Sequence, residues 1–166
     1  NKLEKKIGPF RSRKKKVIMC HGVFDIVHPG HIRHLVFAKS KADILIVSLT
    51  ADIHINKGMY RPHVPEGLRA LNLAAFSFVD YVLVDKNAKP LKNIGILKPN
   101  FFAKGFEYTD GSINLKTLEE ENKLKSFGGE LIFTPGDYVN SSSQLIKQKE
   151  PNISFEKLIY ILEKYK

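Results

Sequence analysis

The chain has a single cysteine, Cys20, among its 166 residues. An internal disulfide framework is therefore excluded, because a disulfide needs two cysteines. No apolar run reaches the roughly 18 residues that a membrane-spanning helix requires. Residues 1–16 lack the apolar centre of a signal peptide. Hydrophobic residues make up 43% of the chain and charged residues 27%, which is typical of a globular protein, and we expect a cytoplasmic protein with no membrane partner.

Acidic residues are scarce at the N-terminus, where the basic charge of the chain is concentrated. Residues 1–16 contain eight lysines and arginines and one glutamate, so that only +3 of the net charge of +10 belongs to the other 150 residues. We predict a basic N-terminal segment over residues 1–15. Such a segment can contact nucleic acid or anionic lipid. A solvated segment before the first strand is the simpler interpretation, and no nucleic-acid partner is expected.

Internal repeats and low-complexity segments are also lacking, and short apolar runs instead alternate with amphipathic stretches. The apolar runs, typical of buried strands, lie at residues 16–20, 44–49, 79–84, 100–104 and 130–134. Helices are predicted at residues 29–40, 68–78, 90–97, 114–127, 141–148 and 154–166. This alternation predicts a single α/β domain over residues 16–150, a doubly wound, mostly parallel five-stranded sheet. The last helix, in residues 151–166, could lead to a second domain.

The stretch from Gly22 to Leu35, GVFDIVHPGHIRHL, follows the first apolar run and continues into a helical pattern. Pro29 suits the first position of a helix. The start of a helix offers free N–H groups and a positive dipole end, which suit a phosphate. His28 and His31 are three residues apart and can face the same anion, and Gly30 lets the backbone approach it. The sequence therefore predicts a nucleoside triphosphate site on this turn, at a strand end where such sheets bind ligands.

A metal site is the alternative for this turn, because His28, His31 and His34 recur every three residues. His34 lies a turn further along the helix, no cysteine or nearby carboxylate completes a set, and a helix N-terminus repels cations. We therefore expect phosphate binding, with no metal ligated directly by the protein.

The motifs together resemble a known family. The His-Pro-Gly-His turn resembles the His-x-Gly-His signature of the nucleotidyltransferase superfamily, in its cytidylyltransferase-like branch. Residues 98–108 are similar to the Lys-Pro-Asp…Lys-Gly-x-x-Tyr segment of the adenylyltransferase domain of ADP-heptose synthases. Residues 57–69 and 140–146 resemble the basic loop and the serine-rich helix start of that domain. The match covers residues 16–148, and it is closest to relatives in which the domain is fused to a PfkB-type sugar kinase. His21 departs from the pattern, since many relatives carry Asn, Thr or Tyr there.

This resemblance implies a Rossmann-like nucleotidylyltransferase. Such an enzyme would transfer a nucleoside monophosphate from CTP or ATP to a phosphorylated sugar or polyol, with a heptose-1-phosphate preferred, and release pyrophosphate. Mg²⁺ bound through the nucleotide phosphates is the implied cofactor. A homodimer, and a fused or separate PfkB-type kinase, are the implied partners.

The expected site residues form three groups. The catalytic residues are His28, His31, Lys57 and Arg61. The nucleotide-binding residues are Gly22, Val23, Phe24, Asp25, Gly30, Lys104, Gly105, Ser141, Ser142 and Ser143. The acceptor phosphate is expected at Lys39 and Arg69. Three consecutive serines exceed the single one that a helix cap needs, whereas Asp25 is almost as well explained as a turn-capping residue.

Two alternative functions stay open at this point. One is a cytidylyltransferase for glycerol-3-phosphate or another alcohol phosphate. The other is a nucleotide-binding module without catalysis, which the intact His28, Gly30 and His31 argue against.

Overall fold

The computed structural model describes residues 5, 14–56, 58, 60–105 and 115–135. Its strands are β1 (Val17–Gly22), β2 (Ile44–Thr50), β3 (Tyr81–Asp85), β4 (Phe101–Lys104) and β5 (Glu130–Phe133). Its helices are α2 (Pro29–Ser40), α3 (Glu66–Ala74), α4 (Leu91–Leu97) and α5 (Leu115–Lys125), with a 3-10 turn, η1 (Asp52–His54). The helices predicted at 141–148 and 154–166 lie outside the described residues, as does most of the basic N-terminal segment. None of the described helices is long and apolar enough to cross a membrane.

The five strands form one sheet in the order β3-β2-β1-β4-β5, and every pairing is parallel. All seven residues of β2 are buried, as are the first four of β1, because central strands of a parallel sheet are covered on both faces. The chain builds outward from β1 on one side to β3 and on the other to β5. The strand order therefore reverses beside β1, and its carboxyl end is the position at which such sheets bind ligands.

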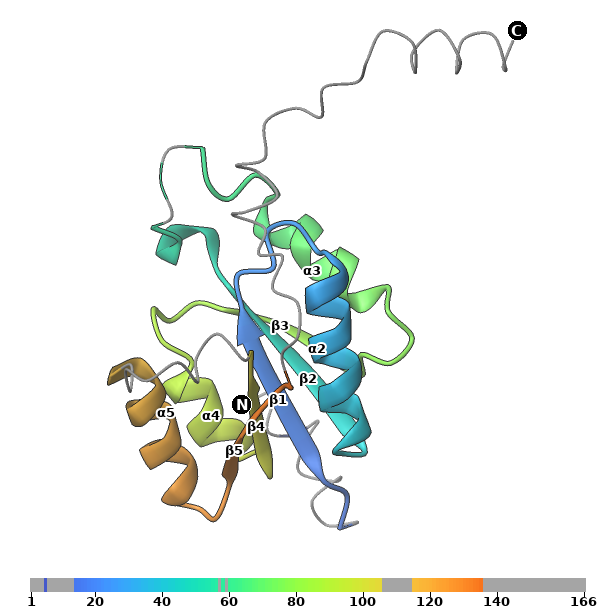
Figure 1. Cartoon of the computed structure of the whole chain (residues 1–166). Helices are drawn as coiled ribbons and strands as arrows, with labels where there is room; N and C mark the ends of the chain where they lie inside the picture. The colour runs from blue at the N-terminus through green and yellow to red at the C-terminus, as the bar shows by residue number, and fades with distance from the viewer. Residues whose placement is uncertain (1–4, 6–13, 57, 59, 106–114, 136–166) are drawn as a thin grey trace, which may run out of the picture.

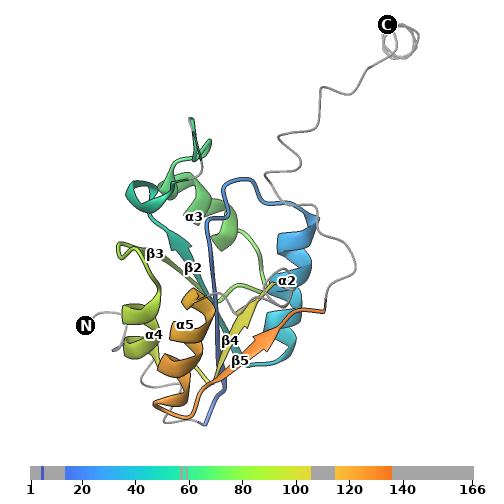
Figure 2. The same cartoon turned by 60° about the vertical axis from the view of Figure 1, so that its left-hand side comes forward.

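Helices cover both faces of the sheet, which confirms the doubly wound prediction. Helices α2 and α3 lie on one side and α4 and α5 on the other (Figure 1), and the two layers stay on opposite sides when the molecule is turned (Figure 2). Alternate residues of β1 enter the two cores: Ile18 and Cys20 join the core under α2 and α3, and Val17 and Met19 join that under α4 and α5.

Helix α3 differs from the helix predicted at residues 68–78. It begins at Glu66, whose backbone N–H donates to the Asp52 carboxylate at 3.1 Å. Asp52 lies 14 residues before Glu66, so a local sequence pattern could not predict that the helix begins at Glu66. The helix ends at Ala74, and Phe76 and Phe78 beyond it stack with ring centroids 5.3 Å apart while packing against the core.

Candidate active site

Helix α2 begins at the carboxyl end of β1, as the turn predicts. His28 is its N-cap, with extended backbone (φ −136°, ψ 169°), and the Nδ1 atom of its ring accepts a hydrogen bond from the Gly30 N–H at 3.2 Å. A neutral imidazole that accepts at Nδ1 carries its proton on Nε2. The first turn of α2 contains no acidic residue. A donor and a positive helix end are thus combined at this point, which suits an anion.

The ring of His31 lies against that of His28, so the two histidines that the sequence places three residues apart are close together. The centroids of these two rings are 3.9 Å apart, and the centroid of the Phe24 ring lies 5.1 Å from that of His31. Phe24 is buried and has φ +51°. A Cβ atom at Gly22 would come within 3.1 Å of the Phe24 ring. The close approach at Gly22 is therefore to Phe24, and it lets this aromatic ring support the histidine pair.

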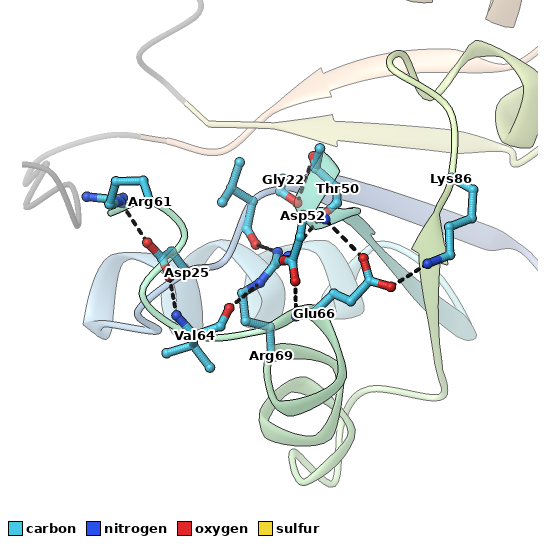
Figure 3. A network of polar contacts seen from close by, with 10 residues as sticks. Gly22, Asp25, Thr50, Asp52, Arg61, Val64, Glu66, Arg69 and Lys86 are labelled. Atoms are coloured by element: carbon cyan, nitrogen blue, oxygen red, sulfur yellow. Dashed lines mark hydrogen bonds and ion pairs between the residues drawn. The ribbon is translucent and has the colours of Figure 1, made fainter. Parts of the chain in front are cut away.

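Asp25 and Arg61, predicted for the nucleotide and for catalysis, lie side by side. Arg61 Nε is 2.7 Å from Asp25 Oδ2, and the Val64 N–H donates to Asp25 Oδ1 at 2.9 Å (Figure 3). Burial opposes ionisation of Asp25, but the backbone N–H groups of Val64 and His63 and the Arg61 guanidinium outweigh it and hold the pKa of the carboxyl below its usual range. The pair connects the loop after β2 to the turn that carries the histidines.

The prediction that Arg69 binds the acceptor phosphate is not supported by its position. The side chain is fully buried in the structure, and its guanidinium donates to three backbone carbonyls and to the Asp52 carboxylate (Figure 3). A phosphate would have to displace these bonds to reach it. The charge of Arg69 acts inside the protein.

Lys39 lies at the end of α2 that is opposite His28 and His31. Helix α2 starts at the carboxyl edge of the sheet and runs back to the opposite edge, so Lys39, near its end, reaches the start of β3. There its Nζ donates to Asp80 Oδ2 and to the carbonyl of Asp43, each at 2.6 Å. A role for Lys39 at a phosphate beside His28 and His31 is incompatible with this placement.

Lys104 and Gly105 end β4 at the carboxyl edge, as predicted. The Lys104 Nζ donates to Thr117 Oγ1 at 2.9 Å and to Glu120 Oε2 at 2.5 Å, on the α5 side of the sheet. The ammonium group is thus paired with a buried carboxylate of α5. The predicted backbone contact with a nucleotide is unaffected by this pairing. Lys57, Ser141, Ser142 and Ser143 lie outside the described residues.

Two histidines that were not predicted as site residues extend this edge of the sheet. His21 Nδ1 lies 2.9 Å from Ser48 Oγ and its Nε2 3.3 Å from Thr50 Oγ1. His34 Nδ1 lies 2.5 Å from Thr134 Oγ1, which links α2 to the end of β5. Burial lowers the pKa of each histidine to about 4. The alternation of side chains along a strand could have indicated His21, because it puts His21 on the face of the sheet opposite Cys20. No local pattern indicates that His34 contacts Thr134, which is 100 positions away.

Within the described residues, no three His, Cys, Asp or Glu side chains are arranged to hold a metal ion. The carboxylate of the turn itself, Asp25, is engaged by Arg61 and Val64. Mg²⁺ commonly binds through substrate phosphates with few protein ligands.

Comparison with known proteins agrees with this geometry. The family model described as cytidylyltransferase-like matches residues 19–149. The bifunctional protein HldE of Helicobacter pylori strain Shi470 is 39% identical over 127 residues, which are 75% of this chain and 27% of that protein. The HldE of Campylobacter jejuni strain RM1221 is 44% identical over 102 residues, 60% of this chain and 22% of that protein. The chain thus spans about a quarter of the length of these curated relatives.

Two solved structures share the fold at lower identity. A lipopolysaccharide core biosynthesis protein from Thermoplasma volcanium superimposes with a TM-score of 0.61 at 23% identity, over 75% of this chain and 99% of the other. A pantoate-beta-alanine ligase from Francisella tularensis gives a TM-score of 0.59 at 17% identity, over 97% and 77% of the two chains. These two structures show the fold alone. The family model, which matches residues 19–149, shows that the chain belongs to the cytidylyltransferase-like family.

Proposed function

We propose that the protein transfers a nucleoside monophosphate from CTP or ATP to a phosphorylated sugar or polyol, with a heptose-1-phosphate preferred. The observation that carries the proposal is the pair of adjacent imidazoles, His28 and His31, at the start of α2 and beyond the carboxyl end of β1. The curated relatives named HldE, which are longer and bifunctional by name, support a sugar-phosphate acceptor.

In the proposed reaction a phosphate oxygen of the acceptor attacks the α-phosphorus of the triphosphate. The bond from that phosphorus to the bridging oxygen breaks, and pyrophosphate leaves. The transfer requires alignment and positive charge where negative charge accumulates. His28, through Nε2–H, and His31 would donate hydrogen bonds to the α-phosphate and the leaving group. A magnesium ion brought by the triphosphate would neutralise phosphate charge.

Several further residues are part of the proposal. Arg61 lies beside Asp25 in the turn and is suited to pair with phosphate oxygens when a ligand competes for it. We assign Lys57 to the same role from its place in the sequence. Ser141, Ser142 and Ser143 are proposed to bind the triphosphate through hydroxyl and backbone groups at a helix start. A homodimer, and a PfkB-type sugar kinase that supplies the phosphorylated acceptor, complete the proposal.

The test incubates the full chain with Mg²⁺, CTP or ATP and a panel of sugar and polyol phosphates, and measures pyrophosphate release. We expect release with one nucleotide and a sugar-1-phosphate. Omitting the acceptor controls for simple hydrolysis of the nucleotide, and glycerol-3-phosphate in the panel separates the alcohol-phosphate alternative. Nucleotide binding without pyrophosphate release for any pair would show that the protein is a binding module.

A further inference from the structure

We infer that Arg69 is a positioning residue that fixes the shape of the turn carrying His28 and His31; the inference rests on the proposed function. Arg69 is fully buried. A buried charge persists in a protein only where hydrogen bonds and an opposite charge compensate its loss of water. The position of those compensating partners shows what this arginine holds in place.

The guanidinium joins the segments that follow β1 and β2. Nη1 donates to the carbonyl of Val23 at 2.5 Å, and Nη2 donates to the carbonyl of Thr50 at 3.0 Å and to Asp52 Oδ1 at 2.5 Å. Nε donates to the carbonyl of Val64 at 2.8 Å. Arg69 therefore uses all three of its nitrogens, and each acceptor lies at the carboxyl end of β2 or in a segment that follows β1 or β2.

The bond to Val23 acts on the histidine turn directly. Val23 precedes Phe24, whose φ of +51° lies in a region that residues with a side chain rarely occupy. Such a conformation persists where the surroundings hold it. The Phe24 ring in turn lies against His31, with centroids 5.1 Å apart. A continuous path of contacts therefore runs from Arg69 through Val23 and Phe24 to His31.

Two acidic residues, Asp52 and Glu66, connect the hydrogen-bond network of Arg69 to the segment after β3. The Asp52 carboxylate accepts from Arg69 and from the Glu66 N–H, while Glu66 Oε2 accepts from the Asp52 N–H at 3.0 Å. Glu66 also pairs with Lys86, just beyond β3 (Figure 3). Lysine in place of Arg69 would supply the charge but not the planar fork that reaches several separate acceptors. The Arg69→Lys variant therefore removes the positioning bonds and keeps the positive charge.

The test compares three full-length proteins: wild type, Arg69→Lys, and Ile94→Val as a matched control. Ile94 is fully buried in the core under α4 and α5, so its variant loosens packing without touching these loops. Thermal melting and circular dichroism check the fold. For Arg69→Lys we expect kcat to fall by about 10²-fold, the size of effect that a small misplacement produces, with a much smaller change in the KM for the nucleotide. The imidazole NMR resonances of His31 should shift in Arg69→Lys and stay unchanged in Ile94→Val.

Retained kcat in a folded Arg69→Lys protein overturns the inference, and so does a loss of kcat with unchanged His31 resonances. If Arg69→Lys does not fold, Asp52→Asn replaces it, because Asp52 is partly exposed and its variant removes the counter-charge of Arg69 together with one acceptor oxygen. Unshifted His31 resonances in that variant also overturn the inference. Absence of pyrophosphate release by the wild type would contradict the proposed function instead, and the His31 resonances would still decide whether Arg69 shapes the turn.

Discussion

At the residue scale, the two histidines of the candidate site, His28 and His31, have different structural roles. His28 caps α2 by accepting from the Gly30 N–H, whereas His31 lies within the helix and its ring contacts those of His28 and Phe24. Substitutions at the two positions should therefore separate catalysis from stability.

Replacing His31 by alanine should lower turnover by about 10²- to 10³-fold, the usual effect of losing one donor to the transition state. The melting temperature should change little, since His31 is only partly buried and has no capping role. Pyrophosphate release and a thermal melt measure the two effects. Arg33→Ala is the control, because Arg33 is exposed on the same helix. Near-normal turnover of His31→Ala would remove His31 from the catalytic group.

Replacing His28 by alanine should reduce both turnover and stability. Loss of an N-cap destabilises a protein by about 1 kcal/mol, which urea denaturation detects. His28→Asn is the matched variant, because asparagine is a good N-cap and should restore stability while turnover stays low. Equal stability of the alanine and asparagine variants would contradict the capping role.

At the scale of elements, α2 is attached to its surroundings on two sides. His34 bonds to Thr134 at the end of β5, and Lys39 pairs with Asp80 before β3. These contacts set the direction of the helix, and with it the place where its N-terminus meets β1. They also explain why a lysine of this helix serves the architecture rather than the phosphate.

Lys39→Ala should leave turnover and the KM for the acceptor unchanged. Its ion pair is partly exposed, with side-chain exposures of 29% and 31%, and such pairs contribute up to about 1 kcal/mol. Steady-state kinetics with varied acceptor, together with urea denaturation, measure both quantities. Lys92→Ala, which changes an exposed lysine of α4, is the control. A raised KM for the acceptor in Lys39→Ala alone would restore the phosphate role that the sequence suggested.

At the scale of the whole molecule, two partly buried histidines, His21 and His34, make stability depend on pH. The pKa values of His21 and His34 are lowered from 6.5 to about 4, chiefly by burial. The unfolded chain therefore binds more protons than the folded protein between these values, and the free energy of unfolding should fall as pH drops through that window. The depressed pKa of Asp25 acts in the same direction at lower pH.

Urea denaturation at pH values from about 7 down to about 4.5 measures this dependence. The free energy of unfolding of His34→Gln should depend less on pH than that of the wild type. The variant lacks one of the two histidines whose pKa is lowered by burial in the folded protein. Equal stability across the range would show that these imidazoles stay accessible to protons in the folded state.

Much of this protein follows from its sequence alone. The apolar runs predicted the five strands, and the His-Pro-Gly-His turn predicted the start of α2 at its observed residue, Pro29. These features are local: strand and helix periodicity and a proline at a helix start all act within a few residues of one another. The family resemblance rests on the same short motifs, and the comparisons confirm it.

Only the tertiary structure decided which cations face the candidate site. Arg69 and Lys39 looked alike in the sequence as residues for a phosphate. Arg69 bonds to Val23, 46 positions away, and Lys39 to Asp80, 41 positions away. A positive charge is attracted to any carboxylate or carbonyl that the fold brings near it, and the sheet order sets which of them arrive. Local patterns therefore locate the turn of the candidate site, while long-range packing pairs these two cations with other groups of the protein.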